Sequence, residues 1–119
     1  MDKSKLDVLR IHDSHSVGVL FHVALKDASE LIERFIKEYV SHKLIILGSE
    51  IGDLGALNAY WRQYIDVVTV TVPNRIELSY EVLAAVLDSE GISANEVVWI
   101  SRHVPPIRYK DTFQIFKMH

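Results

Sequence analysis

The sequence predicts a small α/β domain built around one mainly parallel sheet. Short runs rich in Val, Ile and Leu alternate along the chain with stretches whose apolar residues recur at helical spacing. Strands that alternate with helices form right-handed βαβ units. The length of 119 residues and the apolar content of 49% suit a single domain with its own core.

Two strands and one helix are expected in the first part of the chain. Residues 7–12 and 17–25 are rich in Val, Leu, Ile and Phe, and the polar residues 13–16 between them predict a hairpin loop. Asp27 and Glu30 have the spacing of a capping box, which places the N-cap of a helix at Asp27. The apolar residues that follow share one face of this helix: Leu31, Ile32, Phe35, Ile36, Tyr39 and Val40.

A second strand, helix and strand follow. Residues 44–47 are apolar at every position, as in a strand that is covered on both faces. Residues 51–55 turn the chain into a second helix that has Asp53 as its cap and apolar residues at near-helical spacing: Leu54, Leu57, Trp61 and Tyr64. Residues 67–72 are β-branched throughout, which predicts a third buried strand closed by Pro73.

One helix and two strands complete the expected elements. Residues 79–90 carry apolar side chains on one face, and Gly91 followed by Ile92 predicts a Schellman-type helix end. Residues 97–100 form another apolar run. Residues 113–117 alternate in polarity and carry charge, which is typical of a strand at the edge of a sheet.

These elements together predict a three-layer, Rossmann-like sandwich of ββαβαβαββ order, with a mainly parallel sheet and antiparallel strands at its edges. The alternative is a two-layer, ferredoxin-like α+β arrangement with one additional helix.

Composition excludes several classes of protein. The chain has no cysteine, which rules out disulfide frameworks, thiolate metal sites and cysteine nucleophiles. Its longest apolar stretch, 17–25, is interrupted by His22 and is far shorter than the about 20 residues of a membrane span. The polar residues 1–5 lack the apolar region of a signal peptide. We therefore expect a cytoplasmic protein with no membrane partner.

Candidate ligand-binding residues follow the expected parallel strands. Ligands bind outside the carboxyl ends of such strands, where helix N-termini present free amides. The side chains at these ends, with Lys26 and Asp27 after the first parallel strand, include arginines that match phosphate or carboxylate groups bidentately. We expect an anionic ligand, a nucleotide or another phosphate-bearing molecule, to contact these residues: Ser49, Glu50, Asn74, Arg75, Ser101, Arg102 and Arg108.

The three glycines at 48, 52 and 55 occupy the position of a dinucleotide loop but not its pattern. Their spacing is G-x-x-x-G-x-x-G rather than G-x-G-x-x-G. Glu50 and Asp53 also place negative charge where a pyrophosphate would lie. The two carboxylates could instead bind sugar hydroxyls, hold a divalent cation or cap the second helix.

Three residues near the end of the chain are candidates for catalysis. His103 lies among arginines at a strand end, where an imidazole suits general acid or base chemistry. Tyr109 could act as a nucleophile or stack on a base, and Lys110 could stabilise developing charge. The remaining histidines, including His12, His15 and His22, do not have convincing ligand spacing, so we expect no metal and no cofactor.

Three functions remain open from the sequence, which leaves undecided whether the chain is an enzyme. The first is a module that binds an anionic ligand. The second is a metal-independent phosphodiesterase or nuclease that uses His103, Arg102 and Tyr109. The third is a non-catalytic assembly subunit in which the first strand and residues 113–118 pair with a second copy, so that a homodimer is expected.

Charge is distributed unevenly along the chain. The formal net charge is −3, yet residues 101–119 contain four basic residues, Arg102, Arg108, Lys110 and Lys117, and the single acidic residue Asp111. A net negative charge argues against nonspecific coating of DNA. The cationic last segment nevertheless leaves contact with nucleic acid possible through residues 101–119.

Overall fold

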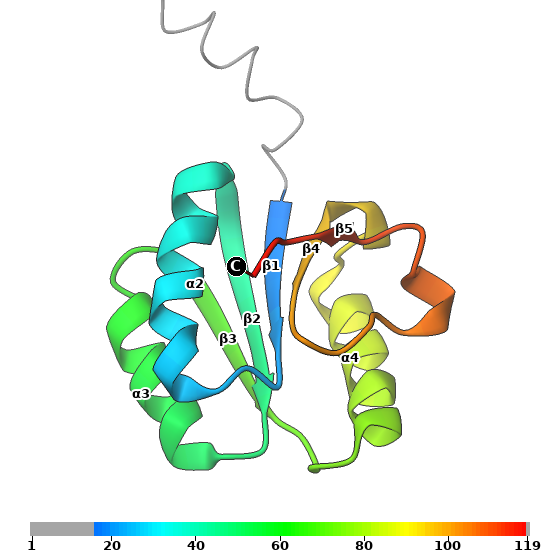
Figure 1. Cartoon of the computed structure of the whole chain (residues 1–119), viewed down its shortest axis with the longest axis horizontal. Helices are drawn as coiled ribbons and strands as arrows, with labels where there is room; N and C mark the ends of the chain where they lie inside the picture. The colour runs from blue at the N-terminus through cyan, green and yellow to red at the C-terminus, as the bar shows by residue number, and fades with distance from the viewer. Residues whose placement is uncertain (1–15, 119) are drawn as a thin grey trace, which may run out of the picture.

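The structure, a computed structural model, describes residues 16–118 (Figure 1). The expected strand at 7–12 and most of the hairpin loop after it lie outside the described residues. The described part contains five strands and three α-helices, with 3-10 turns η2 and η3: β1 Ser16–Phe21, α2 Leu25–Glu38, β2 Ser41–Gly48, α3 Ile51–Trp61, β3 Asp66–Thr71, α4 Ile76–Glu90, η2 Ala94–Glu96, β4 Val97–Ile100, η3 Ile107–Tyr109 and β5 Gln114–Ile115.

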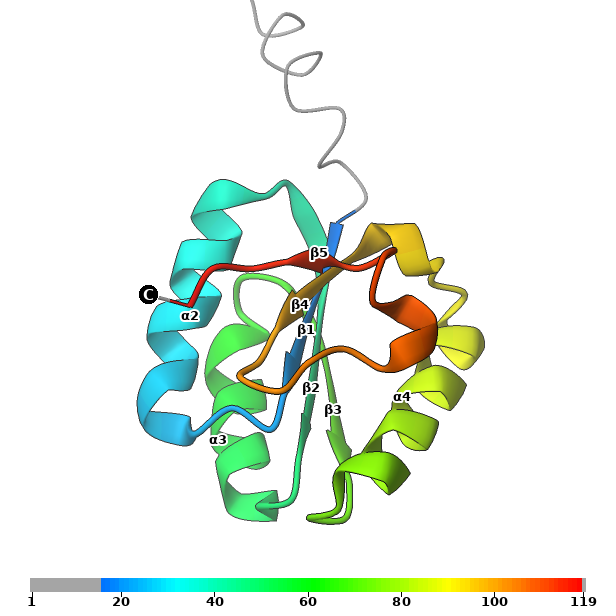
Figure 2. The same ribbon diagram turned by 45° about the vertical axis from the view of Figure 1, so that its right-hand side comes forward.

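All five strands lie in one parallel sheet of order β3-β2-β1-β4-β5. The α/β class and the parallel sheet are therefore confirmed, whereas the expected antiparallel edge strands are not found among these strands. β5 runs parallel to β4 because the segment between them, which includes η3, returns the chain to the amino end of β4 before β5 begins (Figure 2). At the opposite edge, α3 provides the corresponding crossover from β2 to β3.

Helices cover both faces of the sheet (Figures 1 and 2). Helices α2 and α3 pack on one face through a core that includes Phe35 and Trp61, and α4 packs on the other through a core that includes Leu83 and Leu87. The two-layer alternative is therefore not observed. Phe113, just before β5, belongs to the core beneath α4, and Phe116, just after β5, belongs to the core beneath α2 and α3. The last strand is therefore anchored on both faces.

Three helices begin at the carboxyl edge of the sheet without a side-chain cap. Their N-cap residues are Ala24, Glu50 and Arg75, and none of the three makes a capping hydrogen bond through its side chain. The predicted caps Asp27 and Asp53 are wrong by position, because each is the third residue of its helix. The first-turn amides of α2, α3 and α4 thus donate to no N-cap side chain, although the Asp27 amide donates to the Ala24 carbonyl at 3.0 Å.

The predicted end of α4 is confirmed. Gly91 adopts the left-handed conformation with φ of 67°, and the Ile92 amide donates to the Leu87 carbonyl at 2.9 Å. These are the features of a Schellman motif.

None of the helices that the described residues form has the length and apolar composition needed to cross a membrane.

Candidate functional site

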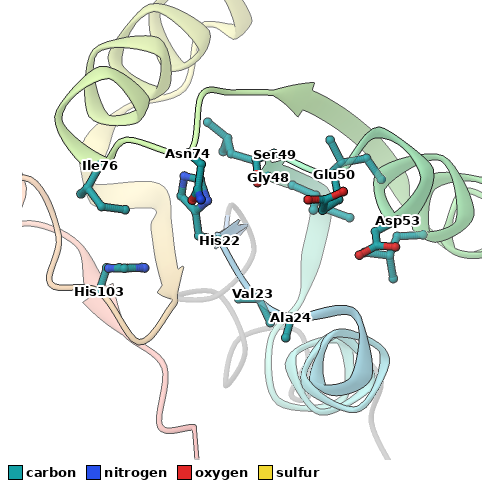
Figure 3. Close-up of a pocket in the computed structure, with 14 residues that line it drawn as sticks. His22, Val23, Ala24, Gly48, Ser49, Glu50, Asp53, Asn74, Ile76 and His103 are labelled. Carbon is teal, nitrogen blue, oxygen red and sulfur yellow. The ribbon is translucent and has the colours of Figure 1, made fainter.

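Loops at the carboxyl edge of the sheet enclose a cavity of about 410 Å³ (Figure 3). The lining comes from the segments that follow β1, β2, β3 and β4. Apolar residues such as Leu54, Leu57 and Ile76 contribute to its walls, and six side chains offer polar groups: His22, Ser49, Glu50, Asp53, Asn74 and His103. The predicted location of the site, outside the carboxyl ends of parallel strands, coincides with this cavity.

The cavity lies where the connections of two neighbouring strands diverge. β1 and β4 are adjacent in the sheet. The chain leaves β1 towards α2 on one face, and it leaves β4 towards η3, where Tyr109 packs against the core of the other face. Open α/β sheets bind ligands at such topological switch points, because the diverging loops leave a crevice between them.

His22, the first residue after β1, is held in an unusual backbone conformation. It is the one described residue other than glycine with a positive φ, at 52°. Its amide donates to the Leu47 carbonyl at 2.9 Å, so the chain leaves the sheet while still bonded to β2. Its ring packs edge-on against Phe21, with the centroids 4.8 Å apart. Backbone strain of this kind persists only where the surroundings fix it, and it is common at functional sites.

The hydroxyl of Ser79 determines which nitrogen of His22 carries a proton. Ser79 is fully buried, and its Oγ lies 2.9 Å from Nε2 of His22. The same Oγ lies 2.9 Å from the Pro73 carbonyl and 3.0 Å from the Arg75 carbonyl. Both carbonyls can only accept, so the single hydroxyl proton points to them and Nε2–H of His22 donates to Oγ. The neutral ring therefore has its lone pair on Nδ1.

The environment of His22 favours this neutral form. Burial lowers the pKa of His22 from its ordinary value of 6.5, and the nearby His103 lowers it further. The two rings face each other in an edge-to-face arrangement with centroids 5.9 Å apart. Two imidazoles from adjacent strands thus flank the crevice.

The backbone of His103 is fixed although its side chain is exposed. Its carbonyl accepts a hydrogen bond of 2.8 Å from Nε1 of the buried Trp99. One residue further on, the Val104 carbonyl accepts from the hydroxyl of Tyr80, whose ring stacks on Phe21. Burial, with a smaller effect of Glu77, raises the pKa of Tyr80, so this phenol stays a donor.

Polar groups of opposite character lie at different ends of the cavity. Figure 3 draws His22, Asn74 and His103 on one side, and Glu50 and Asp53, at the start of α3, on the other. The cavity therefore has an imidazole end and a carboxylate end.

The glycine motif forms no phosphate loop. Gly48 is the last residue of β2, and Gly52 and Gly55 lie within α3. Only Ser49 and Glu50 connect the strand to the helix.

The predicted site residues fall into two groups. The first group lines the cavity: Ser49, Glu50, Asn74 and His103. The second group does not line it: Arg75, Ser101, Arg102, Arg108, Tyr109 and Lys110. Lys26 and Asp27 lie inside α2 rather than after a strand.

The second group has other partners or positions. Arg75 and Arg102 are exposed, but each is next in sequence to a lining residue. The Arg108 guanidinium lies over the ring of Tyr109 at 4.9 Å, and that ring stacks on Phe113 with centroids 4.6 Å apart. Lys110 is exposed just beyond η3. A ligand role for these side chains stays a prediction.

His22 lines the cavity but was not among the predicted site residues. The apolar run 17–25 suggested a strand that continues beyond it, whereas β1 ends at Phe21. The interruption of that run by a histidine was the available signal. Within the described part of the chain, no three His, Asp or Glu side chains are grouped so that they could hold a metal ion.

Comparison with protein-family models, with curated proteins and with solved structures finds no match to this chain. The geometry of the cavity is therefore the ground on which a function can be inferred.

Proposed function

We propose that this protein binds a small sugar phosphate or mononucleotide in the cavity at the carboxyl edge of its sheet. The observation that carries the proposal is the pair of imidazoles, His22 and His103, that face each other across the switch point with ring centroids 5.9 Å apart. The phosphate belongs at this imidazole end, and the sugar at the carboxylate end.

Several features favour a phosphate at the imidazole end. His103 can donate a hydrogen bond to a phosphate oxygen through a protonated ring nitrogen, whereas Nδ1 of the neutral His22 ring accepts one from a protonated phosphate oxygen or from water. The N-terminus of α4 reaches this end of the cavity beside the lining residues Asn74 and Ile76, and its positive end favours an anion. The exposed cations Arg75 and Arg102 flank the lining and add an attractive field.

The carboxylates of Glu50 and Asp53 favour a group with several hydroxyls. A carboxylate accepts hydrogen bonds from hydroxyls and repels a second phosphate. In Rossmann-like domains an acidic residue after the second strand binds ribose hydroxyls, and Glu50 is the second residue after β2. The cavity volume of about 410 Å³ lies in the range of small-molecule sites.

Thermal unfolding with four probes tests the proposal. Ribose 5-phosphate and adenosine 5′-monophosphate should raise Tm more than equal concentrations of ribose or inorganic phosphate. A ligand at 100 times its Kd stabilises a protein by about 2.7 kcal/mol. If none of the four probes changes Tm at millimolar concentration, the proposal is wrong.

Matched variants locate the binding site. His103→Asn should weaken binding of all phosphate-bearing probes, and Glu50→Gln should weaken binding of ribose 5-phosphate while leaving that of inorganic phosphate unchanged. His42→Gln is the control, because His42 is exposed near the amino end of β2, away from the cavity. Equal loss of affinity in His42→Gln would contradict the assignment.

The homodimer and the contact of residues 101–119 with nucleic acid stay predictions. β3 and β5 each have one neighbour in the described sheet, and Ile115 of β5 is 53% exposed, which favours pairing with a second copy. Light scattering distinguishes a dimer from a monomer. A dimer that binds none of the four probes would favour the assembly subunit.

A further inference from the structure

One nitrogen of His22 is fixed and the other is free. Nε2 donates to Ser79, a residue of α4 that is fully buried. Nδ1 has no hydrogen-bond partner among the described residues, although the ring lines the cavity. An imidazole whose far N–H is held by an acceptor has a defined tautomer and a more basic second nitrogen.

The fold maintains this arrangement although the positive φ of His22 strains the backbone. A glycine would adopt the φ of 52° with less strain than a histidine does. The His22 amide, the ring of Phe21 and the Ser79 hydroxyl all hold the residue in place. Ser79 does not need His22 as a hydrogen-bond partner, since its hydroxyl already bonds to the carbonyls of Pro73 and Arg75.

We propose that the cavity is also a catalytic site, at which Nδ1 of His22 removes a proton from water as that water attacks the phosphorus of a sugar phosphate monoester. This inference rests on the proposed function, because it needs the phosphate to lie at the imidazole end. It differs from the sequence prediction, in which His103 alone provided acid or base chemistry.

The reaction balances with water as the only co-reactant. A lone pair of the water oxygen forms the new P–O bond, and the water proton moves to Nδ1 of His22. The bond between phosphorus and the sugar oxygen breaks, its electron pair stays on that oxygen, and a protonated His103 supplies the proton that completes the alcohol. The products are inorganic phosphate and the free sugar. Exchange with solvent then returns both imidazoles to their starting forms.

The surroundings suit a monoester more than a diester. The positive end of α4, beside the imidazoles, can stabilise the charge that develops on the terminal phosphate oxygens. A diester would need a second organic arm beside the imidazoles. The hydroxyls of the one sugar can bind the carboxylates of Glu50 and Asp53 at the other end of the cavity.

Ser79 acts as a positioning residue in this scheme. Without its Oγ, Nε2–H loses its acceptor and the ring is free to take the other tautomer. Ser79→Ala should therefore lower kcat with little change in KM. It should also move the acidic limb of the pH–rate profile to lower pH, because the protonated ring loses a hydrogen bond. A role in packing alone would leave that limb where it is.

Chemical rescue is the decisive experiment. The full chain is incubated with ribose 5-phosphate at saturating concentration, and released inorganic phosphate is measured. His22→Gly suits the positive φ and leaves space for a free imidazole, and it should lower kcat by about 10²-fold or more. Added imidazole should restore a measurable part of the rate. His42→Gln should retain the wild-type rate.

The outcomes separate this inference from the proposed function. If the wild type releases phosphate no faster than His22→Gly while ribose 5-phosphate still raises Tm, the catalytic inference is wrong and binding stands. If ribose 5-phosphate has no effect on Tm and no phosphate is released, both are wrong. Should His22→Gly fail to give a folded circular dichroism spectrum, His22→Asn replaces it, because Asn also tolerates positive φ, and wild-type turnover by that variant overturns the inference.

Discussion

The hydroxyl of Ser101 donates a hydrogen bond of 2.6 Å to the carbonyl of Phe21. This contact joins the end of β4 to the end of β1. The same hydroxyl oxygen accepts the amide of His103 at 3.0 Å. Because His22 directly follows Phe21, one side chain links the two backbone segments that carry the imidazoles of the cavity.

Ser101→Ala should therefore reduce both stability and ligand affinity. The Phe21 carbonyl and the His103 amide both lose a partner, and a lost hydrogen bond of this kind costs about 1 kcal/mol. Urea unfolding and calorimetric titration with ribose 5-phosphate measure the two effects. Ser89→Ala is the matched control, because Ser89 is exposed on α4 and bonds only to the Val86 carbonyl. Loss of stability in Ser101→Ala without loss of affinity would contradict the link between the loops.

The stability of the protein should depend on pH through His22. Burial and His103 lower its pKa from 6.5 in the folded state, so the unfolded chain binds this proton more readily. The free energy of unfolding is then highest above pH 6.5, and it decreases as the pH falls from 6.5 towards the folded-state pKa.

Urea unfolding between about pH 7.5 and pH 5 measures this dependence, above the range where most carboxylates titrate. His22→Asn should remove most of the slope, whereas His42→Gln should keep it. Equal slopes in the wild type and His22→Asn would show that other groups are responsible.

Gly18 should be intolerant of any side chain. A Cβ atom there would lie 2.7 Å from Cε2 and 2.8 Å from Cζ of Phe35, where α2 packs on β1. Gly18→Ala should cost about 1–3 kcal/mol of stability, the usual range for overpacking. Urea unfolding measures the loss, and an unchanged midpoint would mean that α2 moves away freely.

Gly55 should behave in the opposite way. It lies inside α3, and a Cβ atom there meets nothing within 4 Å. Gly55→Ala should stabilise the protein by about 0.5–1 kcal/mol, because alanine favours the helix. Affinity for ribose 5-phosphate should not change. A marked loss of affinity for ribose 5-phosphate in Gly55→Ala would instead favour the hypothesis that the glycine motif approaches a ligand closely, as a dinucleotide loop does.

The ion pairs of Lys43 lie near the amino end of β2, whereas the cavity lies at the carboxyl ends of the strands. Its Nζ bonds to Glu90 and lies 3.5 Å from Asp66, and the hydrogen bond to Glu90 raises the pKa of Lys43. Lys43→Gln should reduce stability by no more than about 1 kcal/mol, less so at high salt. Ligand affinity should be unchanged. Urea unfolding at two salt concentrations and titration with ribose 5-phosphate provide the measurements.

Much of the fold could be predicted because local patterns determine it. The all-apolar run 44–47 lies within β2, the run 97–100 coincides with β4, and Gly91 ends α4 as its sequence indicated. Each of these features is decided by residues close together in the chain. The direction of β5 could not be predicted in this way, because it depends on the path of a connection that crosses the edge of the sheet.

The site was harder to predict than the fold. The end of β1 depends on the bond from the His22 amide to the Leu47 carbonyl of β2, a contact that periodicity does not reveal. The strand was therefore predicted to end at residue 25, so that Lys26 and Asp27 were expected at the strand end where the structure has His22. Arg75 and Arg102 are each next in sequence to a residue that lines the cavity, but the sequence does not determine whether a side chain enters it.

The anchoring of β5 on both faces affects the order in which the protein can be completed during synthesis. Phe113 fills one core and Phe116 the other. A nascent chain that has not yet reached residue 116 lacks an aromatic ring that closes the α2 side of the sheet. Full packing of both layers thus has to wait until residue 116 has been synthesised, and before that point the domain has an uncovered apolar surface that chaperones can recognise.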